Sequence, residues 1–413
     1  MENRDVLVIG AGGVGSVIAR KCAQFPKIFG KIGMASRSRR KADEIAEDLP
    51  FSSGVWVVDA EDARDVARVI RESGAGLVFN AALPVHNLPI MDACLEAGAH
   101  YIDTSAPDLD AGTYDLFPYQ HQFAYEERFR RAGLTGMLSL GFDPGVTNVF
   151  VAWAVKHLYD ELHAVDILDC NGGDHGHPFA TNFNPVVNLM EITQPAIHRE
   201  NGEWVYGKVL EERQDVDFQE IGVRPMYLIY HEELETLARR FPEIRRMRFW
   251  MHFSDQYLWH LQALRNVGMV TLDQVRVGDI DVCPLDVLRA VLPEPASLGP
   301  RYRGKTNIGC YFQGRKDGRS ISHYLYNVCD HEVCYAELKN QAISTTAGVP
   351  AVIGAKLLFD GVWKEAGVRA PEDWDPDPFM AAMADFGLPW QLVETPEMGA
   401  DFGPAPASGS SVS

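Results

Sequence analysis

Two short stretches of the chain gather side chains that can hold a charged ligand or move a proton. Tyr230-His-Glu-Glu233 places one imidazole beside two carboxylates, and Asp174 lies in a second polar stretch, residues 170–177. A carboxylate is a natural partner for an alkylammonium group, and an imidazole exchanges protons near neutral pH. We therefore take Asp174, His231 and Glu233 as candidate catalytic residues. For the stretch around His231, the alternative is a solvated helix start, where acidic residues are favourable.

Glycines beside polar side chains suggest that residues 170–184 form a loop around a small polar ligand. Asn171-Gly-Gly-Asp-His175 is followed by Thr181-Asn-Phe-Asn184. A long surface loop without a ligand is the alternative. The candidate substrate-binding residues in this segment are Asn171, Gly172, Gly173, His175, Phe183 and Asn184.

Two groupings resemble sets of metal ligands, and we predict that neither binds a metal. Asp174, His175 and His177 lie close together, but no cysteine pair accompanies them. Cys329-Asp-His-Glu-Val-Cys334 lies in a strand-like stretch, where successive side chains face opposite ways. The chemistry inferred below also needs no metal ion.

The first residues of the chain indicate which scaffold positions these groups. Val6-Leu-Val-Ile9 suits a buried parallel strand and leads into Gly10-Ala-Gly12-Gly-Val-Gly15 and then a helical stretch. Strand, G-x-G-x-x-G and helix in this order form the dinucleotide-binding fingerprint, in which a pyrophosphate lies at the helix N-terminus. A tight turn that binds nothing is the alternative. The predicted contacts are Gly10, Gly12, Gly13, Val14 and Gly15.

The second predicted strand ends in residues that favour NADP(H) over NAD(H). Residues 32–35 are followed by Ser36, Arg37 and Ser38, at the place where dinucleotide-binding folds that bind NAD usually carry Asp or Glu. Hydroxyl and guanidinium groups suit a 2′-phosphate, whereas a carboxylate would repel it. An exposed basic helix start is the alternative.

Further apolar stretches alternate with helical ones and predict a Rossmann-type parallel sheet. Strands are expected near residues 55–58, 77–80, 101–105 and 136–140. Ligands bind at the carboxyl ends of such strands. The residues expected to face the cofactor there are Asp59, Ala60, Asn80, Ala81, Ala82, Leu83, Pro84, Thr104, Ser105, Gly141, Phe142, Asp143 and Pro144.

The length of 413 residues predicts more than one domain. Predicted strands and helices alternate over residues 1–144, the expected NADP-binding domain of an α/β fold. Residues 145–340 read as an α+β domain for substrate binding and dimerisation, and residues 341–403 as a segment that packs back on the first domain. Residues 404–413 are small and polar, which is typical of a disordered tail.

Composition narrows the class of partner. The formal net charge of -19 argues against nucleic acid, because a phosphate-binding surface needs excess Lys and Arg. The same charge attracts cationic substrates, although it also serves solubility. No signal peptide or membrane-spanning run is visible, and the 7 cysteines do not suggest a disulfide framework. We expect a cytoplasmic protein with small-molecule substrates and no membrane partner.

Together these motifs resemble the saccharopine dehydrogenase-like superfamily, and within it the branch of carboxynorspermidine/carboxyspermidine dehydrogenases (synthases). The resemblance covers nearly the whole chain. One departure is Ala347, which intervenes in the Thr-Thr-Gly motif before Gly348 and affects local loop geometry. The motifs that carry the resemblance are Gly10-x-Gly12-Gly-Val-Gly15, Asn80-Ala-Ala-Leu-Pro84, Tyr101-Ile-Asp-Thr104, Gly141-Phe-Asp-Pro-Gly-Val-Thr-Asn148, Asn171-Gly-Gly-Asp-His175, Thr181-Asn-Phe-Asn-Pro185, Tyr230-His-Glu-Glu233 and Thr345-Thr-Ala-Gly-Val-Pro350.

The resemblance implies an NADPH-dependent reductive condensation in polyamine biosynthesis. L-aspartate 4-semialdehyde and putrescine or 1,3-diaminopropane would form an imine, whose reduction gives carboxyspermidine or carboxynorspermidine. Arg199, Lys208 and Arg248 are candidates for the semialdehyde carboxylate. The resemblance also implies a homodimer. The alternatives are a saccharopine-type reductase, a homospermidine synthase, or a non-catalytic protein that senses NADP(H).

Overall fold

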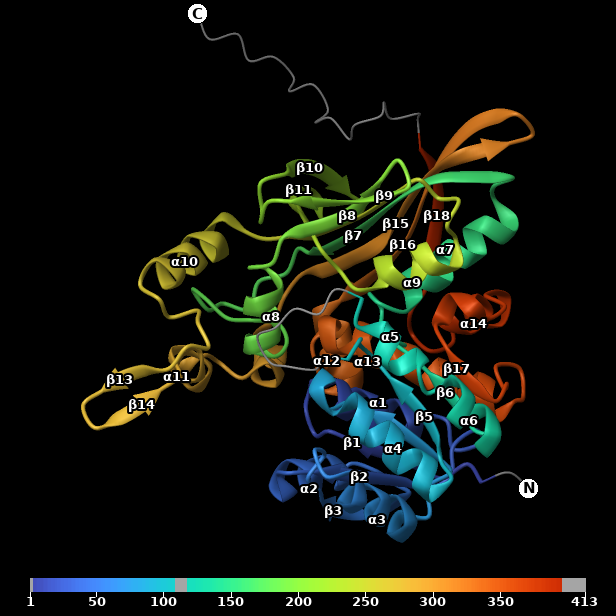
Figure 1. The fold of residues 1–413 in the computed structure, drawn as a ribbon, viewed down its shortest axis with the longest axis vertical. Helices are drawn as coiled ribbons and strands as arrows, with labels where there is room; N and C mark the ends of the chain where they lie inside the picture. Colours follow the sequence, from blue (N-terminus) through green and yellow to red (C-terminus); the bar gives the residue numbers. More distant parts are fainter. Residues whose placement is uncertain (1–2, 108–116, 396–413) are drawn as a thin grey trace, which may run out of the picture.

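The computed structural model describes residues 3–107 and 117–395, which contain two large sheets (Figure 1). The first sheet has seven strands, and every neighbouring pair is parallel. In spatial order its strands are β17 (Gly367–Arg369), β6 (Thr135–Met137), β5 (His100–Asp103), β4 (Leu77–Asn80), β1 (Val6–Ile9), β2 (Ile32–Ser36) and β3 (Ser52–Val57).

Helices cover both faces of this sheet, as its continuous apolar strands require. Val6 and Val8 point to one face, where Val17 and Ile18 of α1 pack, while Leu7 and Ile9 point to the other. The elements of this half between the strands are α1 (Gly13–Gln24), α2 (Arg39–Ala46), α3 (Ala63–Ser73), η1 (Pro84–His86), α4 (Asn87–Ala97), α5 (Tyr119–Phe123) and α6 (Glu126–Ala132).

The second sheet is mixed and lies above the first in Figure 1. Its main path runs through β10 (Arg213–Phe218), β11 (Gly222–Ile229), β12 (Arg246–His252), β7 (Glu161–Asn171), β15 (Lys305–Lys316), β16 (Arg319–Asp330) and β18 (Trp390–Thr395), with β8 (Ala196–Glu200) and β9 (Glu203–Gly207) beside it. The helices joined to it are α7 (Val146–His157), α8 (Pro185–Glu191) and α9 (Glu233–Arg240).

Strand β7 alternates between two apolar clusters. Val165 and Ile167 face the cluster shared with the first half of the molecule, whereas Leu168 and Cys170 face an outer cluster with Trp250. Side chains at odd positions of β7 therefore point toward the dinucleotide-binding half.

An arm projects from the body, on the left of Figure 1. It consists of α10 (Asp255–Asn266), the hairpin β13 (Val275–Val277) and β14 (Ile280–Val282), and α11 (Pro284–Val291). The chain then returns toward the first half through η2 (Pro295–Arg301).

The last third of the chain crosses between the halves. Helices α12 (His331–Leu338) and α13 (Ala342–Phe359) return to the first half, where α13 packs along α1, and β17 joins the edge of the first sheet. After η3 (Pro371–Asp373) and α14 (Asp377–Met383), however, β18 pairs with β16 of the second sheet. The segment expected at 341–403 thus contributes to both halves as far as residue 395, and the tail at 404–413 lies outside the described residues.

Helix α13 is long and apolar enough to cross a bilayer, the one such helix among the described residues, and 83% of it is buried inside the protein. It is the core helix between the two halves. The 7 cysteines are all free and buried.

Candidate active site

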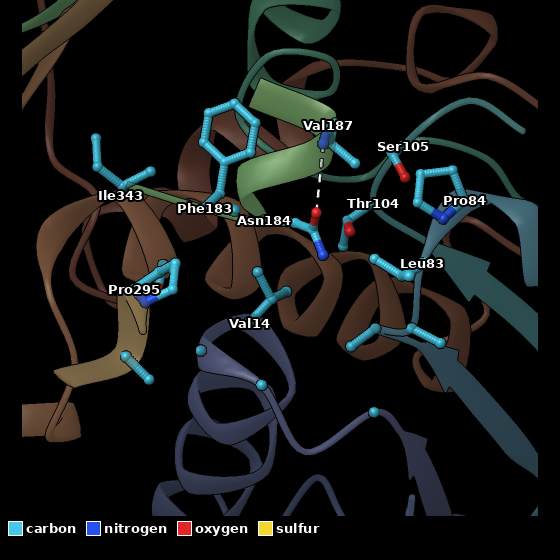
Figure 2. Close-up of a pocket in the computed structure, with 18 of the residues that line it drawn as sticks. Val14, Leu83, Pro84, Thr104, Ser105, Phe183, Asn184, Val187, Pro295 and Ile343 are labelled. Carbon is cyan, nitrogen blue, oxygen red and sulfur yellow. Dashed lines mark hydrogen bonds between the residues drawn. The ribbon is translucent and has the colours of Figure 1, made fainter. Parts of the chain in front are cut away.

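A cavity of about 990 Å³ opens between the carboxyl ends of the first-sheet strands and the inner face of the second sheet. Figure 2 shows side chains from both halves around one space, with Val14 of α1 facing Asn184. Asn184 accepts a hydrogen bond from the backbone N–H of Val187 at 3.3 Å. The other residues labelled there are Leu83, Pro84, Thr104, Ser105, Phe183, Pro295 and Ile343.

The glycine turn fits a dinucleotide. A Cβ on Gly10 would lie 2.3 Å from the carbonyl oxygen of Ala81, and one on Gly15 would lie 1.9 Å from the carbonyl oxygen of Gly10. A Cβ on Gly12 would meet nothing within 4 Å, and Gly12 lines the cavity. The turn is therefore closed on the protein side and open on the side where a pyrophosphate would lie, at the N-terminus of α1.

The end of β2 supplies hydroxyl and cationic groups to one end of the cavity. Ser36, Arg37, Ser38 and Lys41 all line it. Ser38 caps α2 by accepting from the N–H of Lys41 at 3.5 Å, and Lys41 is paired with Glu294 from the segment that precedes η2. Hydroxyl groups and a guanidinium suit the 2′-phosphate of NADP(H).

Three residues predicted to contact the cofactor do not line the cavity. Gly15 packs α1 against the turn, and Asp59 is exposed, its carboxylate accepting from the N–H of Glu61 at 3.1 Å. Asn80 is buried and accepts from the N–H of Ala82 at 3.1 Å, so it shapes the loop that does line the cavity. The predicted cofactor contacts that line it are Gly10, Gly12, Gly13, Val14, Ser36, Arg37, Ser38, Ala60, Ala81, Ala82, Leu83, Pro84, Thr104, Ser105, Gly141, Phe142, Asp143 and Pro144.

A buried polar network holds the strand ends behind the cavity. Asp103 accepts from the hydroxyl of Tyr101 at 2.8 Å, from Gln122 at 2.6 Å and from the backbone N–H of Ser139. Burial raises the pKa of Asp103 to about 7, against the hydrogen bonds that lower it. The network joins β5 to the residues that follow β6, and so fixes the loop that carries Asp143.

The opposite end of the cavity is acidic and contains part of the predicted catalytic set. His231 and Glu232 line it at the start of α9. The Nδ1 atom of His231 hydrogen-bonds to the buried carboxylate of Glu233, and its ring stacks on Phe249 with centroids 4.1 Å apart. Burial raises the pKa of Glu233, and the imidazole beside it opposes this shift. Glu233 therefore orients His231 rather than reaching the cavity itself.

Two aspartates complete this end, and sequence reasoning overlooked one of them. Asp143 follows the first sheet, Asp169 lies near the end of β7, and both line the cavity. Asp169 lies opposite Met251 on one neighbouring strand and Ile308 on the other, and these apolar side chains also line the cavity. The available signal was its position on the same face as Val165 and Ile167, where a carboxylate is out of place unless it is functional.

Most of the polar 170–177 segment lies elsewhere. Asn171 donates to the hydroxyl of Tyr302 at 2.5 Å and contacts His331 Nε2 at 3.0 Å, while Asp174 and Arg303 exchange backbone hydrogen bonds. Asn171, Gly172, Gly173, Asp174 and His175 do not line the cavity, because beyond Asp169 the chain leads away from it toward Tyr302. From the predicted substrate set, Phe183 and Asn184 do line it.

The basic residues suggested for a substrate carboxylate also lie away from the cavity. Arg248 is paired with Glu200, Arg199 donates to the carbonyl of Pro242 at 2.9 Å, and Lys208 is exposed and pairs with Glu211. The register pairs Arg199 with Met247, so strand alternation places Arg248 on the opposite face, where it meets Glu200. Within the described ranges, no group of three or more His, Cys, Asp or Glu residues is arranged to hold a metal ion.

Relatives of known identity match almost the whole chain. It is 48% identical over 389 residues to the carboxyaminopropylagmatine dehydrogenase of a Synechocystis species, covering 94% of this chain and 97% of the relative. It is 41% identical to the carboxynorspermidine synthases of Vibrio alginolyticus and Vibrio cholerae, again covering 94% of this chain and 97% of each relative.

Solved structures with similar architecture are more distant in sequence. The yeast saccharopine dehydrogenase (L-Glu forming) superposes with a TM-score of 0.72 at 14% identity, covering 95% of this chain and 100% of the other. The homospermidine synthase of Legionella pneumophila, in complex with NAD, gives 0.69 at 13% identity and covers 95% and 92%. These likenesses concern the fold alone, and they confirm the predicted fold class.

Two family models divide the chain between them. The saccharopine dehydrogenase NADP binding domain matches residues 6–137, and the saccharopine dehydrogenase C-terminal domain matches residues 141–388. The NADP(H) preference predicted from Ser36 and Arg37 is thereby confirmed for the family. The chain belongs to the saccharopine dehydrogenase family and is an NADP-dependent oxidoreductase.

Proposed function

We propose that this enzyme joins L-aspartate 4-semialdehyde to a linear amine with a second cationic end, by forming a C=N bond and reducing it. With putrescine or 1,3-diaminopropane as the amine, the products are carboxyspermidine or carboxynorspermidine. With agmatine, the product is carboxyaminopropylagmatine. Each product belongs to polyamine biosynthesis.

The separation of charge along the cavity carries this proposal. Among the described residues that line it, the Arg and Lys side chains are Arg37, Lys41 and Arg289, and Lys41 pairs with Glu294 of the segment that continues from Arg289. Asp143, Asp169 and Glu232 line the other end. A polyphosphate fits the first end and a cationic amine fits the second.

The side chains at the acidic end have separable tasks. NADPH, when bound, supplies a hydride to the carbon of the C=N bond. Glu232 accepts from the N–H of Ala106 at 3.3 Å, which places its carboxylate beside the cavity for the amine. His231, oriented by Glu233, holds or releases a proton at Nε2, and Asn182, Asn184, Thr104 and Ser105 offer neutral donors for the aldehyde's carboxylate.

The relatives narrow the chemistry but leave the amine open. Carboxyaminopropylagmatine and carboxynorspermidine both carry a carboxyaminopropyl group on an amine, which is the group that aspartate semialdehyde supplies on reduction. The amines differ in length and in whether the far end is an ammonium or a guanidinium. A planar guanidinium donates two hydrogen bonds to one carboxylate, and Glu232, which lines the cavity, is the candidate for that contact.

NADPH absorbance tests the proposal directly. Purified enzyme is mixed with NADPH, aspartate semialdehyde and one of three amines: agmatine, putrescine or 1,3-diaminopropane. We expect rapid oxidation with at least one pair and little with the aldehyde or any amine alone. Mass spectrometry of the product then identifies the condensed amine.

The competing activities give different outcomes. NADPH oxidation only with aminoadipate semialdehyde plus glutamate would identify a saccharopine-type reductase. Tight cofactor binding without NADPH oxidation on any aldehyde and amine pair would favour a sensor. A homodimer and a cytoplasmic location complete the proposal, and light scattering of the pure protein at several concentrations tests the first.

A further inference from the structure

Asp143 and Asp169 come from different halves of the molecule and hydrogen-bond to each other on the cavity wall. Asp143 lies in the turn between Gly141 and Gly145, where the N–H of Gly141 donates to the carbonyl of Pro144 at 2.9 Å. Two ionised carboxylates can only accept hydrogen bonds, so a bond between them requires one proton. The pair therefore holds one proton and one negative charge.

The surroundings of the pair favour that single proton. Burial and the negative charges of Asp169 and Glu233 raise the pKa of Asp143 well above its ordinary range, and His231 opposes the shift. Met251 and Ile308 flank Asp169 with apolar surface. The titratable groups near Asp143 or on the cavity wall are His231, Glu232 and Glu233 near the start of α9 and Cys310 on β15. Cys170, Tyr302 and Tyr324 interact with Asp169.

We propose that Asp143 and Asp169 form a proton-sharing catalytic pair that carries out the dehydration by which amine and aldehyde become a C=N bond. This inference rests on the proposed function and names the acid and the base of the condensation that precedes reduction. It assigns His231 and Glu233 to other proton movements, because Nδ1 of His231 is held by Glu233 rather than by the pair.

The proton count of the pair suits this step. Ionised Asp169 takes a proton from the ammonium, and the freed nitrogen lone pair attacks the aldehyde carbon, forming a C–N bond. The carbonyl electron pair moves to oxygen, which takes the second proton of the nitrogen and becomes a hydroxyl. Asp143 then protonates this hydroxyl, the C–O bond breaks, and water leaves as the nitrogen lone pair forms the C=N bond of an iminium ion.

The pair starts and finishes with one proton, which has moved from Asp143 to Asp169. Aldehyde plus ammonium gives iminium plus water, so the charge on the substrates is also unchanged. A single carboxylate could take the first proton from nitrogen and return it to oxygen, but it would have to reach the two atoms in turn. Two hydrogen-bonded carboxyls hold the acid and the base at the same time, as coupled carboxylate pairs do elsewhere.

Kinetics in the reverse direction separate dehydration from hydride transfer. The isolated product is mixed with enzyme and NADP+ in a stopped-flow instrument, and NADPH appears once the iminium ion forms. Steady turnover additionally requires water to add to the iminium ion, which is the reverse of the proposed step. Asp143→Asn and Asp169→Asn are compared with Asp217→Asn, a change at an exposed position of β10.

We expect both cavity variants to form NADPH in a rapid burst that approaches one per active site. Their steady rate should then fall by about 100-fold or more, because general acid–base catalysis contributes on that order. Asp217→Asn should behave as wild type, and thermal unfolding checks that each variant is folded. If an Asn variant does not fold, Asp143→Ser and Asp169→Ser take its place.

Wild-type enzyme provides a second measurement. Its steady reverse rate should depend on pH through two ionisations of the pair, while the burst rate should lack at least one of these. The proposal is overturned if the cavity variants keep their steady rates, if their burst slows as much as the steady rate, or if both wild-type rates share one pH profile. If wild-type enzyme oxidises NADPH with no aldehyde and amine pair, the proposed function itself is refuted.

Discussion

Gly12 and Gly15 stand in one fingerprint but meet different surroundings. A Cβ at Gly12 would enter open cavity, whereas a Cβ at Gly15 would collide with the backbone of Gly10 at 1.9 Å. One glycine leaves room for a ligand and the other leaves room for the protein itself. Substitution by alanine can therefore separate cofactor binding from folding.

We predict that Gly12→Ala folds normally and binds NADPH at least about 10-fold more weakly, since a methyl group would displace the pyrophosphate from its hydrogen bonds. Gly15→Ala should lower the free energy of unfolding by about 3 kcal/mol or more, because backbone must move. Thermal unfolding and fluorescence titration with NADPH measure the two effects. Equal melting temperatures for both variants would contradict the assignment.

Arg37 is predicted to set the choice between the two nicotinamide cofactors. Arg37→Asp should weaken NADPH binding by about 100-fold, the value of a lost charged hydrogen bond plus a new repulsion, and leave NADH binding nearly unchanged. Arg40→Asp serves as the control, because Arg40 is exposed and paired with Glu44 on α2. Titrations with both cofactors decide the matter, and a parallel loss for NADPH and NADH would show that Arg37 does not contact the phosphate.

At this scale, local motifs predicted well where the chemistry is local. Strand ends supplied most of the predicted contacts that line the cavity, because their position follows from the parallel sheet alone. Asp169 was overlooked because its significance depends on Asp143, which lies in the other half of the molecule. Arg199 and Arg248 are candidates by charge alone, and the structure shows each engaged with a neighbour, a contact that spacing does not reveal.

Among the elements, α12 begins at a histidine that ties three segments together. His331 Nδ1 accepts from the N–H of Ala342 at the start of α13 at 3.1 Å, so Nε2 carries the hydrogen and faces Asn171 at 3.0 Å. Its ring stacks on Tyr302 with centroids 3.7 Å apart. The polar 170–177 segment is thus a structural joint between β7, α12 and α13.

Stability should depend on pH through this joint. Burial lowers the pKa of His331 from 6.5 to about 4, helped by His175 and opposed by Asp330. The unfolded chain takes up a proton below pH 6.5 while the folded chain does not, so this contribution to stability is complete above pH 6.5 and declines toward pH 4.

We predict that His331→Phe, which keeps an aromatic ring against Tyr302, lowers the free energy of unfolding by about 2 kcal/mol near neutral pH, because the N–H of Ala342 loses its acceptor. The gap to wild type should narrow as the pH falls from 6.5 toward 4. Denaturant unfolding across this range measures it, with exposed His163→Phe as the control. A gap that does not change with pH would be evidence against a neutral, buried His331.

The order of the late elements could not be predicted from their own residues. Periodicity identifies α13, but the three residues of β17 and the six of β18 are too short to carry a strand signal that names a partner. Their partners lie in different sheets, so a single docking site for residues 341–403 was too simple an expectation. Pairing between distant strands is a property of the assembled fold.

For the whole molecule, the cavity lies between two halves that share one large apolar cluster. Cofactor binding should therefore stabilise both halves together. We predict one cooperative thermal transition whose midpoint rises with NADP+, with a gain of about 2.7 kcal/mol at a concentration 100-fold above Kd. Calorimetry tests this, and NAD+ at equal concentration should give a smaller shift. Two transitions, with only one responding to NADP+, would contradict it.

Strand β17 has a consequence for the order in which the chain can become folded. The dinucleotide-binding sheet receives its outermost parallel strand, residues 367–369, only after the whole second sheet apart from β18 has been synthesised. On the ribosome, the edge of β6 therefore stays open while more than half of the polypeptide emerges, and an open edge invites incorrect pairing. A nascent chain stopped before Gly367 should engage chaperones more strongly than one released after Arg369.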